Sequence, residues 1–159
     1  MCKIQTLRYK DGELAYYMDH RQDLREKILK CLEWLDSGLA EQGWKNIKSP
    51  ASLVDTVLDE FTILEVGNTL VAFTVGQPWF IDGTVIAEEF IAPFANPPAP
   101  ISEVVRALEL VGESAGCVML SLGTRANPRQ QGLARLFEQT GAKLSTIELV
   151  KEIHHGKSL

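Results

Sequence analysis

The chain is poor in cysteine and lacks the patterns in which cysteines usually act together. Its three cysteines, Cys2, Cys31 and Cys117, are an odd number at wide spacing, with no C-x-x-C pair. A disulfide framework or a zinc site is therefore not expected. Cys31 and Cys117 lie within apolar patterns, where a thiol acts as a small hydrophobic side chain. The sequence thus predicts no metal site.

Long apolar runs and a surplus of positive charge are also missing. No apolar stretch reaches the 18 or so residues typical of a membrane span, and the first 13 residues lack the apolar centre of a secretory signal. The chain has 16 basic and 21 acidic residues, giving a net charge of −5. Nucleic-acid-binding proteins usually carry a basic surplus or stripe. We therefore expect neither nucleic acid nor membrane as a partner, and we expect a cytoplasmic protein.

What is present fits one folded domain covering residues 1–159. Apolar residues make up 45 % of the chain, a normal share for a globular domain. At this length one hydrophobic core suffices without disulfides. No internal repeat or linker divides the sequence.

The first half of the chain predicts one strand followed by two helices. Residues 3–9 alternate as a strand does. Residues 20–36 place apolar side chains at helical spacing, with Asp19 and Gln22 as a cap pair and Gly38 as a stop. A second helix starts at Ser49-Pro50, a capping residue followed by a first-turn proline.

The second half predicts a meander of strands and then alternating helices and strands. Four prolines between positions 93 and 100 indicate an irregular loop, and the last helix opens at Asn127-Pro128. The expected strands are 61–66, 69–75, 84–92, 117–122 and 144–153, and the expected helices are about 101–114 and 127–141. The element order is β-α-α-β-β-β-α-β-α-β.

This order and two short segments resemble the GNAT superfamily of acyl-CoA N-acyltransferases. Residues 88–93 (EEFIAP) are similar to the family's fourth strand, which ends in an apolar-x-Pro step. Residues 135–142 (RLFEQTGA) are similar in spacing to its last helix. The resemblance covers roughly residues 60–153 and implies an α/β (α+β) fold: a mixed, mainly antiparallel sheet with helices on both faces. The ending also loosely resembles small GNAT-like proteins of bacteriophages, which would place the protein in a host cytoplasm or a virion.

A second alignment with the same family is possible. Residues 129–134 (RQQGLA) match the Q/R-x-x-G-x-G/A signature of its cofactor loop. A further strand, helix and strand should then follow, but only 25 residues remain after Ala134. Because short motifs carry little weight without context, we interpret this match as accidental.

The resemblance implies a binding site for acetyl-CoA and a catalytic base. Glu88 aligns with a carboxylate often found in the fourth strand, so it is the candidate base. Phe90, Ile91 and Ala92 would align the acyl-pantetheine chain, and the backbone N–H groups of Ile101, Ser102 and Glu103 would hold the pyrophosphate at a helix N-terminus. The implied reaction moves an acetyl group to a primary amine of a small molecule or protein.

Two departures from the family pattern support an alternative. The loop before residue 101 has prolines and no glycine, so it offers few N–H donors, and Phe137 stands where the family has a tyrosine. A catalytically degenerate binding or structural protein with a protein partner is therefore the second hypothesis. Trp79 and Phe80 either cap the core, which we favour, or line a substrate or partner pocket. An unrelated α+β domain is a third hypothesis, favoured if strands 84–92 and 117–122 are not adjacent and parallel.

Overall fold

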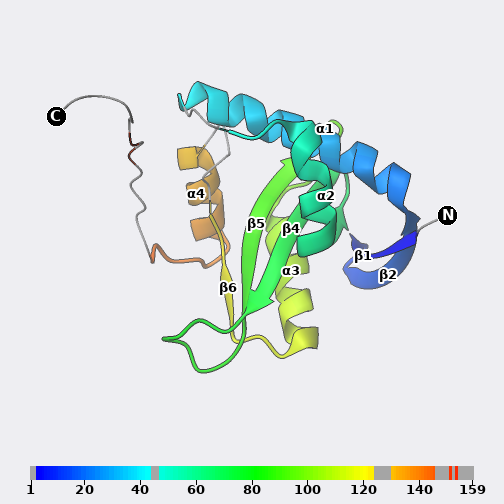
Figure 1. Ribbon diagram of the computed structural model, residues 1–159. Coiled ribbons are helices and arrows are strands. Elements are labelled where there is room, and N and C mark those ends of the chain that lie inside the picture. The colour runs from blue at the N-terminus through cyan, green and yellow to red at the C-terminus, as the bar shows by residue number, and fades with distance from the viewer. Residues whose placement is uncertain (1–2, 44–46, 124–129, 146–150, 152, 154–159) are drawn as a thin grey trace.

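The computed structural model describes the chain except residues 1–2, 44–46, 124–129, 146–150, 152 and 154–159 (Figure 1). Its strands are β1 (Lys3–Lys10), β2 (Glu13–His20), β3 (Thr62–Val66), β4 (Thr69–Gly76), β5 (Val85–Pro93) and β6 (Met119–Ser121). Its helices are α1 (Arg21–Glu41), α2 (Pro50–Glu60), α3 (Ile101–Ala115) and α4 (Gln130–Gln139).

The six strands form one mixed sheet in the order β2-β1-β3-β4-β5-β6. The β1–β2, β3–β4 and β4–β5 pairs are antiparallel, whereas the β1–β3 and β5–β6 pairs are parallel. The protein therefore has the mixed α/β class predicted from its sequence. In the part of the chain that the structure describes, every helix is too short or too polar to cross a bilayer.

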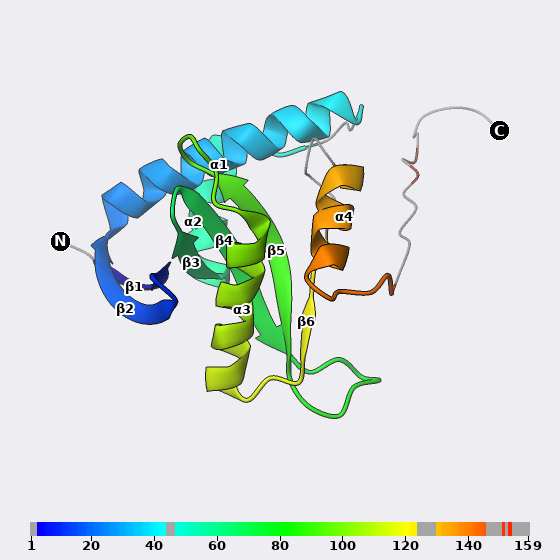
Figure 2. The same ribbon diagram turned by 180° about the vertical axis from the view of Figure 1, so that it is seen from behind.

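The sheet separates two hydrophobic cores (Figures 1 and 2). Helices α1 and α2 pack on one face, and α3 with α4 packs on the other. Successive residues of β3 and β4 alternate between the cores, because side chains along a strand point to opposite faces in turn. The core beside α3 holds Leu64, Val66, Val71 and Phe73, and the core beside α1 holds Ile63, Leu70 and Ala72.

Strand β2 is an element that the sequence analysis missed. It follows β1 through the two-residue turn Asp11-Gly12, whose φ angles of 52° and 81° are those of a type I′ hairpin. The Asp-Gly pair was the signal for this hairpin. Strand β2 itself gives no clear apolar alternation, because most of its residues are exposed on both faces.

Helix α1 runs five residues further than the predicted boundary at residue 36. Gly38 lies buried inside the helix and does not end it; the C-cap is Gln42. The predicted cap pair is also wrong. His20 is the N-cap residue, and the Asp19 carboxylate instead accepts hydrogen bonds from Thr6 and Arg8.

The other boundaries are closer to expectation. Ser49 occupies the N-cap position of α2, although its side chain makes no capping hydrogen bond, and Pro50 lies in the first turn. Gly116, in the left-handed conformation at φ 71°, ends α3. The predicted start of the last helix lies outside the described residues. Most of the expected strand 144–153 also lies outside them, and its described residues, 144, 145, 151 and 153, are not in a strand.

Candidate functional site

The candidate site lies where β5 and β6 part. The two strands pair in parallel only from Val85–Ala87 against Met119–Ser121. Beyond Ala87, no described strand pairs with β5 on this side, although β5 continues to Pro93. The adjacent, parallel arrangement removes the observation that would have favoured an unrelated α+β domain.

A β-bulge in β5 sits at this same point. Phe73 of β4 pairs with Glu88, but its neighbour Ala72 pairs with Phe90, so Glu89 is an extra residue in β5. Glu88 therefore shares the α3 face of the sheet with Phe73. The Glu89 side chain is exposed and accepts a hydrogen bond from the Thr74 hydroxyl at 3.4 Å. Bulges often occur beside active sites, and here the extra residue shifts the register of β5 directly after Glu88.

The surroundings of Glu88 favour its protonated form. The pKa of Glu88 is raised from 4.5 to about 7, chiefly by burial and to a smaller extent by the neighbouring charge of Glu89. The Gly123 N–H, two residues beyond β6, donates to Glu88 Oε1 at 3.4 Å and partly offsets this effect. A carboxylate with a pKa near neutrality can accept or release a proton at physiological pH. No sequence signal pointed to Gly123, because its contact depends on where β6 ends.

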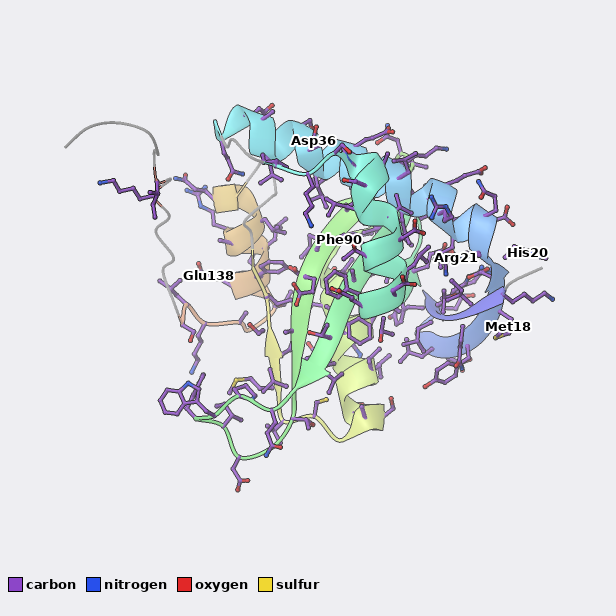
Figure 3. The ribbon with its side chains drawn as sticks, viewed as in Figure 1. Met18, His20, Arg21, Asp36, Phe90 and Glu138 are labelled. Carbon is purple, nitrogen blue, oxygen red and sulfur yellow. The ribbon has the colours of Figure 1, made fainter. Side chains whose placement is uncertain are left out.

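The three β5 residues expected to align a pantetheine chain have buried side chains. Phe90, labelled in Figure 3, and Ala92 belong to the core under α1 and α2, and Ile91 belongs to the core under α3. Only their backbone groups, along the edge of β5 that β6 leaves free, are placed to meet an extended ligand.

The loop between β5 and α3 is tied to the β3–β4 turn. The Asn68 side-chain amide donates to the carbonyls of Asn96 and Pro97, at 3.3 and 3.2 Å. The buried Thr69 hydroxyl accepts the N–H of Ala99 at 2.9 Å. These bonds hold the start of α3 against the sheet. They give the loop hydrogen bonds that its prolines, which have no N–H, cannot donate.

We expect Thr69→Val to reduce the free energy of unfolding by about 1 kcal/mol, since it leaves the partly buried Ala99 N–H without an acceptor. Urea unfolding followed by circular dichroism measures the change. Thr62→Val, at an exposed position of β3, is the matched control and should change stability by less than about 0.5 kcal/mol. Equal effects of the two substitutions would show that the Thr69 bond contributes nothing.

The start of α3 offers fewer donors than predicted. The carbonyl oxygen of Pro100 accepts the N–H groups of both Glu103 and Val104, at 3.0 and 3.2 Å. This leaves the N–H groups of Ile101 and Ser102 as the donors at the N-terminus. Ser102 and Glu103 are exposed, so a ligand could reach this end of the helix. An anion there would gain from the helix dipole.

Helix α4 contributes packing rather than chemistry. Phe137 and Leu133 are buried in the core beside α3, as the core interpretation of Phe137 predicted. Helix α4 begins at Gln130, so it contains most of the segment 129–134 that we interpreted as an accidental match to the cofactor loop. No strand or helix appears among the residues described after α4. Arg129 itself lies outside the described residues.

The core interpretation of Trp79 and Phe80 was wrong. Both lie in the β4–β5 loop, with 95 % and 68 % of their surfaces exposed, and their rings meet edge to face at 5.5 Å. They precede Val85, the start of β5, in the chain. Glycine and proline around these aromatic residues indicated a turn, but that signal does not say which way the side chains point.

The described residues contain no group of three or more His, Cys, Asp or Glu side chains placed to hold a metal ion. No protein-family model matches the chain, and no curated protein matches it. A solved structure, that of an isoleucine-to-methionine mutant of TTHA1254 from Thermus thermophilus, is similar with a TM-score of 0.45 and 10 % identity. That likeness covers 84 % of this chain and 95 % of the other.

Proposed function

We propose that the protein is a GNAT-like N-acyltransferase that moves an acetyl group from coenzyme A to a primary amine. The observation that carries the proposal is Glu88. This partly buried carboxyl, with its pKa raised to about 7, lies where β5 and β6 part. A proton acceptor beside an open strand edge suits the removal of a proton from an amine that attacks a thioester.

In this reaction Glu88 accepts a proton from the attacking nitrogen. The nitrogen forms a bond to the thioester carbon, the carbon–sulfur bond breaks, the coenzyme A thiolate takes a proton from solvent, and Glu88 releases its proton to solvent. Solvent supplies that proton because Phe137, where the family has tyrosine, has no hydroxyl and is buried. The expected cost is a slower reaction, since a general acid typically contributes about 10²–10⁴-fold.

The residues that would hold acetyl-CoA lie along β5 and at the start of α3. The backbone of Phe90, Ile91 and Ala92 would pair with the extended pantetheine arm. The N–H groups of Ile101 and Ser102 would meet the pyrophosphate, as helix N-termini commonly bind phosphate. Glu103 is the weakest part of this assignment, since its N–H already bonds to Pro100 and its carboxylate repels an anion.

The second candidate function is a catalytically degenerate fold that binds another protein, such as a phage virion or host protein. The exposed pair Trp79 and Phe80 favours it, because exposed aromatic side chains are enriched in protein-binding surfaces. The prolines before α3 favour it too, because they reduce the number of phosphate donors.

Calorimetric titration with acetyl-CoA separates the two candidates. If the protein is an acyltransferase, acetyl-CoA should bind with micromolar affinity and Glu88→Gln should bind it about equally well. With an amine acceptor present, Glu88→Gln should slow acetyl transfer by about 10²-fold or more, and the wild-type rate should rise with pH through about 7 as Glu88 loses its proton. Absence of binding at millimolar acetyl-CoA would contradict the enzyme proposal and favour the binding protein.

A further inference from the structure

Strand β2 leaves one long edge of the sheet open. It is the terminal strand of the sheet, and among the described strands only β1 pairs with it. In the two-residue hairpin, Lys10 and Glu13 form the hydrogen-bonded pair next to the turn. Hydrogen-bonded and non-hydrogen-bonded pairs alternate from there. The backbone N–H and C=O groups of Leu14, Tyr16 and Met18 therefore point away from β1, toward the open edge.

The same edge carries exposed apolar side chains. Tyr16 and Met18 are 69 % and 59 % exposed on the α3 face of the sheet, and Tyr17 is 41 % exposed on the other face. Figure 3 shows Met18 at the outer side of the hairpin. Natural edge strands usually carry lysine, proline or a bulge that blocks further pairing. The five residues 14–18 (LAYYM) contain neither lysine nor proline, and the β1–β2 register is unbroken.

We propose that β2 pairs antiparallel with β2 of a second copy of this chain, joining two sheets across a two-fold axis at Tyr16. An isologous interface needs a surface that complements itself. The outward-pointing backbone groups and the apolar side chains of Leu14–Met18 meet this requirement. With Tyr16 opposite Tyr16, Leu14 lies opposite Met18. On the other face, Ala15 lies opposite Tyr17. Every outward-pointing backbone group from Leu14 to Met18 then has a partner.

At the two ends of the strand this register brings acidic side chains together, which opposes it. Glu13 of one copy would lie opposite Asp19 of the other. The Asp19 carboxylate is already paired with Arg8 of its own chain, which reduces the repulsion. The Arg8 guanidinium also lies 4.2 Å from the centre of the Tyr17 ring, which holds that side chain in place at the edge. A two-fold axis at Tyr17 would instead place Leu14 opposite His20, the N-cap of α1.

Sedimentation equilibrium of the full chain over about 5–500 µM tests the proposal. We expect a concentration-dependent rise in mass from 17.7 kDa toward twice that value. Because the paired segment, Glu13–Asp19, is a small interface, the dimer should be weak. Tyr16→Lys would place two like charges opposite each other at the axis, and should weaken the dimer by at least about tenfold.

Trp79→Lys is the matched control, because it adds the same charge in place of an exposed aromatic residue far from β2. It should leave the dimer unchanged, and the circular dichroism spectra of both variants should match that of the wild type. Met18→Lys is a second edge variant and should also weaken the dimer. A wild-type protein that stays monomeric to 500 µM would overturn the proposal. A dimer broken by Trp79→Lys but kept in Tyr16→Lys and Met18→Lys would overturn it too.

Discussion

Phe73→Ala is expected to lower the free energy of unfolding by about 3–5 kcal/mol. Phe73 is the largest fully buried side chain among the described residues and lies in the core beside α3. Removing its ring loses the transfer free energy of a phenyl group and leaves a cavity that the rigid sheet cannot close. This loss is a large share of the roughly 5–15 kcal/mol by which domains are stable, and urea unfolding measures it.

Two further variants make this test specific. Val75→Ala, two residues along the same strand at a 49 % exposed position, should cost less than about 1 kcal/mol. Phe73→Leu, which leaves a smaller cavity, should fall between the two and remains measurable if the alanine variant does not fold. A loss at Phe73 no larger than that at Val75 would mean that the two cores do not have the packing described.

Glu88→Gln is expected to stabilise the protein at pH 8 by about 2 kcal/mol and to have almost no effect near pH 4. The pKa of Glu88 is about 7 in the folded protein and 4.5 as an ordinary value. Between these values the folded state holds a proton that the unfolded state has released. Stability therefore falls as pH rises from about 4.5 to about 7. Glutamine stays neutral, so it escapes this loss.

The difference between these two pKa values corresponds to an upper limit of roughly 3 kcal/mol, which partial exposure of Glu88 reduces. Urea unfolding of both proteins between pH 4 and pH 8 measures the difference. Glu89→Gln removes the same charge from the adjacent, exposed side chain and should change stability by less than about 0.5 kcal/mol at any pH. A pH-independent difference between wild type and Glu88→Gln would contradict the raised pKa.

Much of the fold follows from local patterns in the sequence. Helical spacing predicted α1 to α3, and the change to strand spacing predicted β3, β4 and β5 with small boundary errors. Gly116 ended α3 as expected, because its φ of 71° suits glycine. Gly38 did not end α1, since a glycine can also occupy a crowded helix position when its surroundings bury it. Sequence position alone does not separate these two uses.

The candidate site depended on features that local patterns do not contain. The sequence identified Glu88 as a titratable side chain in a strand, but not the bulge that shifts the register of β5 directly after it. It also gave no sign that Gly123 lies beside it, because this contact joins residues 35 positions apart. Likewise, an apolar pair in a turn fits a core or a surface equally well, and only the path of the β4–β5 loop exposes Trp79 and Phe80.

The extra residue Glu89 has a consequence for how β5 is encoded. Before it, Ile86 and Glu88 belong to the α3 face; after it, that face receives Ile91, while Phe90 and Ala92 belong to the other. The alternation of core-facing residues along the β5 sequence therefore shifts by one residue at the bulge. Loss of this single codon would make the strand regular and leave every side chain from Phe90 onward facing the same core as before. The bulge is therefore what lets β5 carry one residue more than its partner strand β4 without turning its apolar side chains to the wrong face.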